Sequence, residues 1–114
     1  MTNNIKTIKF TQPLSNLILD GKKHTTWRLW KDNRGINIGD IVGFVVSDTN
    51  VEFAKAQITS IKDTTFQELT DEDKDGHESF SCEDEMYQTY STFYNIKVTK
   101  ETNLKVIKFT LINS

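Results

Sequence analysis

The sequence has 114 residues, of which 36% are hydrophobic and 26% charged, and its net charge is −2. This length predicts a single domain over residues 1–114, and the longest apolar run, Ile41–Val46, is too short to cross a bilayer. A single cysteine, Cys82, excludes an internal disulfide and suits a reducing compartment. Because the first ten residues contain no apolar signal segment, we expect a cytoplasmic protein that does not act in a membrane.

The first half of the chain predicts three strands and one helix. Alternating apolar residues predict a strand over 5–10. A helix begins at Gln12, where Pro13 fits the first turn, and it ends at Gly21. A second strand is expected over 25–30, and after the polar loop 32–39 the apolar run 41–46 predicts a third.

The second half predicts further strands and two short helices. A hairpin turn at 48–50 leads into a strand over 51–61, which is long enough to need a bulge or bend. A short helix is expected at 66–69, an acidic loop at 71–77, and a closing strand over 104–112. Aromatic residues at helical spacing predict an amphipathic helix over 86–94, with Ser81 as its candidate cap.

Together these elements predict an α+β fold of five to six strands with two to three short helices between them. The strands would form a small, strongly bent sheet with helices at one side. Hydrophobic periodicity is consistent with either an open sheet or a closed barrel.

Charge is unevenly distributed along the chain. Residues 68–85 contain nine acidic side chains and one basic one, Lys74, so the remainder carries thirteen Lys and Arg against seven Asp and Glu. Five of these cations fall within thirteen residues: Lys22, Lys23, Arg28, Lys31 and Arg34. A basic stretch of this kind is typical of a phosphate-binding face. The alternative is an ordinary solvated surface.

The segment from Gly21 to Arg28 is the most informative for chemistry. Alternate side chains of a strand share a face, so Thr26 and Arg28 should point one way, and Thr25 and Trp27 the other. Lys23, at the turn, can lean over the same face as Thr26. An ammonium, a hydroxyl and a guanidinium meeting there would suit an anion or a nucleobase.

The order of these motifs resembles the ASCH domain family. The residues that carry the resemblance are Gly21-Lys-Lys-His-Thr-Thr-Trp-Arg28, Gly39-Asp40 and Asp75-Gly-His-Glu-Ser79. ASCH domains are similar to PUA domains, so the resemblance implies a small PUA-like β-barrel. It also implies a cleft for a partner that is RNA, a modified nucleoside or a nucleotide. In that cleft, Lys22, Arg28, Trp30, Lys31 and Arg34 are the candidate ligand-binding residues, with Trp30 as a surface for base stacking.

One bacterial branch of this family, which hydrolyses the acetyl amide of N4-acetylcytidine, is similar in length and in the turn motif. The resemblance implies that Lys23, deprotonated by burial, takes a proton from Thr26, which attacks the acyl carbon. Glu78 would protonate the leaving amine, and Arg28 would hold the ligand or the oxyanion. The structural alternatives are a solvated Lys23, a Thr26 that serves strand propensity, and an Arg28 paired with Asp40.

A calcium site is a further alternative, because Asp71-x-Asp73-x-Asp75-Gly76 matches the first half of an EF-hand loop within 71–83. The second half departs from that pattern, with Cys82 where the loop needs glutamate. The two histidines, His24 and His77, and Cys82 lack metal-ligand spacing. We therefore predict no metal and no cofactor, and the sequence leaves the oligomeric state open.

Overall fold

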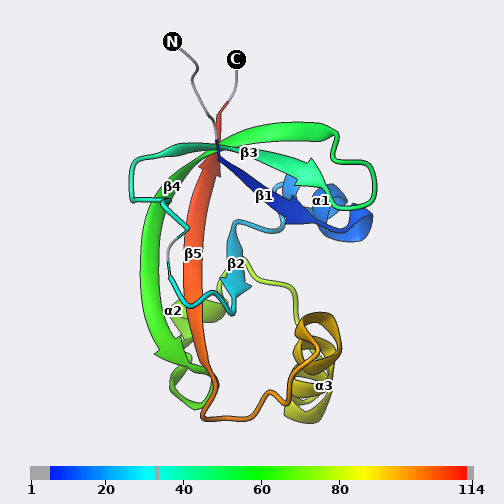
Figure 1. Cartoon of the computed structure of the whole chain (residues 1–114), viewed down its shortest axis with the longest axis vertical. Helices are drawn as coiled ribbons and strands as arrows, with labels where there is room; N and C mark the ends of the chain where they lie inside the picture. Colours follow the sequence, from blue (N-terminus) through cyan, green and yellow to red (C-terminus); the bar gives the residue numbers. More distant parts are fainter. Residues whose placement is uncertain (1–5, 33, 113–114) are drawn as a thin grey trace.

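The chain folds around a five-stranded mixed sheet, described by a computed structural model over residues 6–32 and 34–112 (Figure 1). The elements in chain order are β1 (Thr7–Phe10), α1 (Gln12–Leu19), β2 (Thr25–Arg28), β3 (Ile41–Val46), β4 (Glu52–Thr65), a 3₁₀ turn η1 (Phe66–Glu68), α2 (Asp71–Lys74), α3 (Glu83–Tyr94) and β5 (Asn103–Leu111). The strand order is β1-β3-β4-β5-β2, with β1 parallel to β3 and the other pairs antiparallel. The two edge strands, β1 and β2, therefore come from the first 28 residues.

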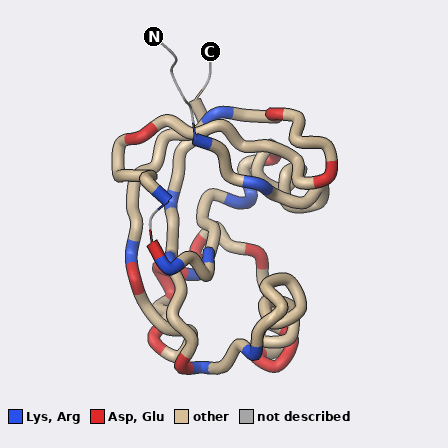
Figure 2. The backbone as a smooth tube through the Cα atoms, viewed as in Figure 1, with Lys and Arg blue, Asp and Glu red and all other residues tan. Residues whose placement is uncertain are grey.

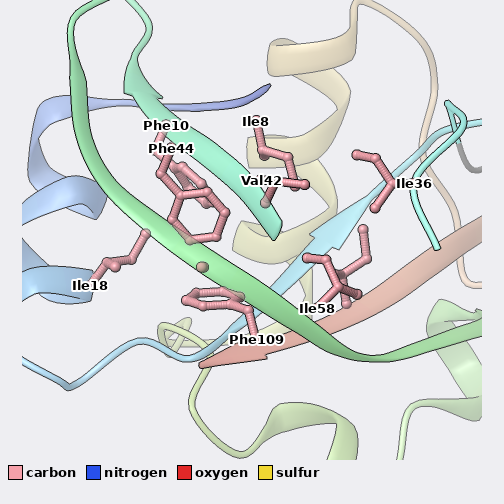
Figure 3. Packing of buried hydrophobic residues seen from close by; sticks show 10 residues of the cluster. Ile8, Phe10, Ile18, Ile36, Val42, Phe44, Ile58 and Phe109 are labelled. Atoms are coloured by element: carbon pink, nitrogen blue, oxygen red, sulfur yellow. The ribbon is translucent and has the colours of Figure 1, made fainter. Parts of the chain in front are cut away.

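One hydrophobic core lies where β1, β3, β4 and β5 meet helix α1 (Figure 3). On β1, Ile8 and Phe10 are buried whereas Thr7 and Lys9 are exposed, as the two-residue period of a strand requires. Phe10 and Phe44 lie with their ring centroids 4.8 Å apart. This cluster fixes β1 beside β3 and so sets the position of one edge strand.

A second core lies beneath α3 and fixes the other edge strand. Trp27 of β2 packs with Phe66, and Met86 and Tyr90 close the cluster from α3. The apolar face predicted for this helix is confirmed at Met86 and Tyr90, which are both buried. Helix α3 is thereby held close to β2.

The predicted α+β class and its five strands and short helices are confirmed. In the described residues the strand ladders run from β1 to β2 without a ladder joining these two edges. The start of the first strand, at Ile5, lies outside the described residues. Within that same part of the chain, none of the helices is long and apolar enough to cross a bilayer.

Two local predictions were wrong. Residues 71–74 form helix α2 rather than a loop, because Thr70 and Asp73 make a reciprocal capping box at its start. The residue that caps α3 is Cys82 rather than Ser81, whose backbone N–H and hydroxyl instead bond to the carboxylate of Glu85 at 3.0 and 2.9 Å. In addition, β4 continues four residues beyond the expected end at Ile61.

Candidate functional site

A cavity of about 410 Å³ lies between the edge strands β1 and β2 and against α3. Small-molecule sites usually have volumes of about 300–1,000 Å³. Its aromatic lining includes Phe10, Trp30, Phe80, Tyr90, Phe93 and Tyr94. Polar groups enter this aromatic enclosure from β2 and from Glu78. A second cavity, of about 610 Å³, lies by Lys108, whose ammonium is already bonded to the carbonyls of Glu72 and Asp75. We therefore place the candidate site in the first cavity.

Strand β2 contributes Thr26, Trp27 and Arg28 to the cavity lining, and the hydrogen bond between Thr26 and Arg28 shows that these two share a face, as the alternation of a strand predicted. The Arg28 guanidinium donates from Nε to the Thr26 hydroxyl at 3.2 Å and from Nη2 to the carbonyl of Lys9 at 2.8 Å. Its carbon lies 4.6 Å from the ring centroid of Phe10. Arg28 thus bridges the two edge strands at the inner end of the cavity. Burial lowers the pKa of Arg28, but an arginine stays charged at neutral pH.

A buried ion pair lies beside this inner end. The Lys23 ammonium donates to Glu78 Oε1 at 2.5 Å and to the carbonyl of Thr25 at 2.8 Å. The Lys23 side chain is 1% exposed and that of Glu78 is 23% exposed, and only Glu78 of the two lines the cavity. Burial lowers the pKa of Lys23, and the attraction of Glu78 offsets this only in part. For Glu78, burial opposes ionisation, but the charges of Lys23 and His77 and the hydrogen bonds to the carboxylate together prevail and lower the pKa of the carboxyl.

His77 supports this pair from behind. Its side chain is 1% exposed and stacks on Trp27 with ring centroids 3.7 Å apart. Nδ1 lies 2.8 Å from the carbonyl of Glu78, and Nε2 lies 3.1 Å from the hydroxyl of Tyr90. A carbonyl can only accept, so Nδ1 carries the proton and Nε2 accepts the hydrogen bond from Tyr90. Burial, reinforced by the charge of Lys23, lowers the pKa of His77 to about 4, so the ring is neutral at physiological pH.

Strand β2 also anchors the segment that carries Glu78. The Trp27 indole donates to the carbonyl of Asp73 at 3.0 Å, and the Thr25 hydroxyl donates to that of Asp75 at 2.6 Å. The carbonyl of Gly76 accepts from the backbone N–H groups of His24 and Thr25 at 2.8 and 3.1 Å. The face of β2 opposite Thr26 therefore holds residues 73–76, and Glu78 follows two residues later.

The backbone conformation favours glycine at position 76 of this anchor. Its φ is +78°, a left-handed conformation, and a Cβ there would displace the exposed ring of His24. We expect Gly76→Ala to lower the free energy of unfolding by about 1–2 kcal/mol. Gly39→Ala is the matched control, since Gly39 has a φ of +95° with open space around it. If chemical denaturation gave equal losses for both variants, the contact with His24 would contribute nothing.

The other predicted ligand-binding residues divide into two groups. Trp30 and Arg34 line the cavity, with the Arg34 guanidinium 4.8 Å from the Trp30 ring centroid. Lys22 and Lys31 are exposed and are absent from the lining, so their contact with a ligand stays a prediction. The suggested pairing of Arg28 with Asp40 is not formed, because Asp40 accepts from the backbone N–H of Asn37 instead.

Several lining residues escaped the sequence analysis. Lys9 is exposed on β1 and lines the cavity, although it lies outside the basic stretch that drew attention. Phe93, on the predicted aromatic helix, is 64% exposed and lines the cavity instead of joining the core. His77, which is absent from the lining, was considered only within the 75–79 motif and as a metal ligand; its contacts with Trp27 and Tyr90 were missed because these partners are distant in sequence. The position of Phe93 at the edge of the apolar face of α3 was the one usable clue.

The acidic segment does not assemble a metal site. Asp73 is buried in the capping box of α2 and accepts from the Lys62 ammonium at 2.8 Å. Burial opposes its ionisation, but the hydrogen bonds from Lys62 and Thr70 prevail and lower the pKa of Asp73. Among the residues described, no three His, Cys, Asp or Glu side chains form a group that could hold a metal ion. The calcium alternative therefore finds no converging donors in residues 71–83.

The fold and the cavity define a class of protein: a small α+β domain with a five-stranded mixed sheet and a ligand-sized cavity between its edge strands. A family model described as "ASCH domain" matches residues 5–113, and the chain belongs to the ASCH domain family. This confirms the resemblance at the level of the family. ASCH domains have a PUA-like fold that is generally associated with RNA binding.

Solved structures agree with this fold. An ASCH domain from Lactobacillus crispatus is 14% identical, with a TM-score of 0.66 over 93% of this chain and 79% of that chain. A protein from Enterococcus faecalis is 11% identical, with a TM-score of 0.75 over 98% of this chain and 78% of that one. An ASCH protein from Zymomonas mobilis, solved as an S128A mutant, is 15% identical, with a TM-score of 0.64 over 94% and 72%. No curated protein matches the chain significantly. At these identities the likeness concerns the fold alone.

Proposed function

We propose that the chain binds a nucleobase-bearing ligand, an RNA nucleotide or a modified nucleoside, in the cavity between β1, β2 and α3. The observation that carries this proposal is the aromatic enclosure with hydrogen-bonding groups of both kinds at its inner end. Arg28 offers donors there, and Glu78 offers a carboxylate acceptor. Flat aromatic walls suit a base, because every base has a face that stacks.

The arrangement of donor and acceptor favours a cytosine-like edge. Cytosine presents one amino donor beside two acceptors, and carboxylates are suited to accept from its 4-amino group. Glu78 would accept from that amino group while Arg28 donates to a ring acceptor. The Arg28 position is firm, because Phe10, Thr26 and the carbonyl of Lys9 all contact its guanidinium.

Binding is tested by titrating cytidine and uridine into the protein and following amide shifts by NMR. We expect cytidine to bind more tightly, because uridine replaces the amino donor by a carbonyl that would face Glu78. Arg28→Met should weaken cytidine binding about tenfold or more, since a hydrogen bond to a charged group is lost. Lys100→Ala, which changes an exposed cation outside the cavity lining, is the control. Shifts confined to surfaces away from β1, β2 and α3 would contradict the proposal.

A second candidate, hydrolysis of the acetyl amide of N4-acetylcytidine, is favoured by the Lys23–Glu78 contact. Transfer of one proton from the Lys23 ammonium to Glu78 yields a neutral amine and a protonated carboxyl together. These are the forms that a general base and a general acid need. Burial opposes both charges, but the pKa of Glu78 is still lowered, so the ion pair is the resting form and the transfer would occur when substrate binds.

The chemistry would then use three side chains. The Thr26 oxygen attacks the acyl carbon and its proton passes to the Lys23 amine, while Glu78 protonates the nitrogen as the C–N bond breaks. Water then attacks the acetyl ester: its oxygen bonds to the acyl carbon as the bond to the Thr26 oxygen breaks. One of its protons returns to Thr26 and the other leaves with the product as acetic acid, so the Lys23–Glu78 pair ends with the one proton it began with. The hydrogen bond from Arg28 to the Thr26 hydroxyl, at 3.2 Å, would stabilise the oxygen as it loses its proton.

Hydrolysis is tested by incubating the protein with N4-acetylcytidine and measuring cytidine by chromatography. We expect Thr26→Val and Lys23→Met to lower the rate by about 10²–10⁴-fold. Cytidine affinity of Thr26→Val should fall far less than the rate, because Phe10 and the carbonyl of Lys9 still hold Arg28 when the Thr26 hydroxyl is lost. Wild-type protein that binds cytidine without producing it from the acetylated form would leave binding as the function.

A further inference from the structure

The charge of the cavity is opposite to that of the chain. Its charged lining residues are Lys9, Arg28, Arg34 and Glu78, and the negative charge of Glu78 is already matched by Lys23. The other three, Lys9, Arg28 and Arg34, therefore face the cavity, and in the described residues none of them has a carboxylate within 4 Å. The net charge of the whole chain, by contrast, is −2. Figure 2 shows basic positions on β1, on β2 and on the loop after it, and acidic positions at the start of α3.

Arg28 is the most buried of these cations. It is buried, yet its recorded partners are a carbonyl and a hydroxyl, which carry no charge. Those bonds use Nε and Nη2. Nη1 has no recorded hydrogen bond. Every buried side-chain nitrogen or oxygen among the described residues has a hydrogen-bond partner, so Nη1 is not buried, and it is open to the cavity that Arg28 lines. A buried charge without a counter-charge is costly, and an anion in the cavity would offset that cost.

The cations are arranged by depth. Arg28 lies at the buried inner end, whereas Lys9 and Arg34 are exposed and form the rim. Trp30 joins the two levels, because its ring centroid lies 5.9 Å from the Arg28 guanidinium carbon and 4.8 Å from that of Arg34. The Asp32 carboxylate accepts from the backbone N–H of Arg34 at 2.7 Å and is absent from the lining, so it does not occupy the guanidinium.

We propose that the rim formed by Lys9 and Arg34 holds a phosphate of the ligand, so that the site selects a nucleotide over the free nucleoside. This inference rests on the proposed nucleobase binding at the inner end. The phosphate belongs either to a mononucleotide or to a phosphodiester within a strand, since both present the anionic oxygens that Arg and Lys recognise. A base at the inner end, between the aromatic walls, leaves its sugar and phosphate toward the rim.

The test compares the affinities of cytidine, 5′-CMP, 3′-CMP and the dinucleotide CpC by calorimetry. We expect at least one phosphate-bearing ligand to bind about tenfold or more tightly than cytidine. The double variant Lys9→Ala/Arg34→Ala should remove that advantage, so that the ratio of nucleotide affinity to cytidine affinity falls to about one. Added salt should weaken the nucleotides more than cytidine.

The outcomes separate the two proposals. Equal affinity of wild-type protein for cytidine and for all three phosphate-bearing ligands would overturn the phosphate rim while leaving nucleobase binding intact. Failure of all four to bind would overturn both. Preference for a mononucleotide over CpC would identify a free nucleotide as the ligand, and the reverse would identify a strand. Lys100→Ala should keep the full phosphate advantage, and its loss in that variant would show a general charge effect instead of a local rim.

Discussion

Glu78→Gln should lower the free energy of unfolding by about 3 kcal/mol, although it replaces one side chain by another of the same shape. Lys23 is 1% exposed, and the Glu78 carboxylate is its charged partner. Removing one member of a buried ion pair typically costs about 3–5 kcal/mol, because the remaining charge stays buried. We expect the lower end of that range, since Glu78 is 23% exposed and water in the cavity can reach Lys23 through the variant. Urea denaturation at neutral pH measures the loss.

The same variant should have an altered pH dependence. The pKa of Lys23 is already lowered by burial, and removal of the carboxylate lowers it further. In the unfolded chain, Lys23 titrates near the ordinary lysine value of 10.5. Between the lowered pKa of the folded variant and this value, the unfolded chain binds more protons than the folded chain does. Stability therefore rises with pH in that window. The deficit of Glu78→Gln relative to wild type should shrink as the pH increases from about 7 toward about 10.

Two variants serve as controls for this prediction. Glu52→Gln breaks the exposed pair with Lys55, whose side chains are 44% and 41% exposed, and should cost less than about 0.5 kcal/mol. The double variant Lys23→Met/Glu78→Gln removes both charges and should be more stable than Glu78→Gln alone. A loss in Glu78→Gln no larger than that in Glu52→Gln would show that Lys23 is not an unpaired buried charge.

The parts of the site that could be predicted from the sequence are those set by local geometry. Thr26 and Arg28 share a face because they are two residues apart on a strand, and no distant contact is needed to infer it. Pro13 and Gly21 likewise mark the two ends of a helical segment through their own backbone preferences. The class of fold followed from the same periodicities.

The parts that could not be predicted depend on contacts between distant residues. The residues near Lys23 do not reveal its partner: the family resemblance placed Glu78, 55 residues away, in the same site. The recorded hydrogen bonds of the Lys23 ammonium go to Glu78 and to the carbonyl of Thr25 rather than to Thr26. Lys9 lines the cavity only because β1 and β2 end up as opposite edges of one sheet. Helix α2 was missed for a different reason: its acidic sequence is typical of a loop, and the capping box that stabilises it is a single reciprocal pair.

Acidification should destabilise the protein through His77 by about 2 kcal/mol between pH 7 and pH 4.5. The folded pKa of His77 is about 4, against 6.5 for the ordinary imidazole. Between these values the unfolded chain binds a proton that the folded chain does not, so stability falls as the pH decreases through this window. The carboxylates of Glu78 and Asp73, whose pKa values are lowered, add a loss of the same sign at lower pH. Chemical denaturation at several pH values measures the slope.

His77→Gln separates the imidazole from these carboxylates. The variant is expected to be less stable at neutral pH, because it loses the stack on Trp27. Between pH 7 and pH 4.5, however, the free energy of unfolding of this variant should fall by about 2 kcal/mol less than that of wild type, since glutamine does not titrate. A wild-type slope in His77→Gln would mean that the buried ring can take up a proton without cost.

Such an outcome would also contradict the arrangement of protons at the site. A protonated ring has two donors, so Nε2 could no longer accept from the Tyr90 hydroxyl, which would have to turn away. Nδ1 would still donate to the carbonyl of Glu78. A second positive charge would then lie beside Lys23, and repulsion between them would favour the neutral amine of that lysine. The neutral ring therefore keeps Lys23 as the single cation behind Glu78, and the acid lability of the fold is the measurable consequence.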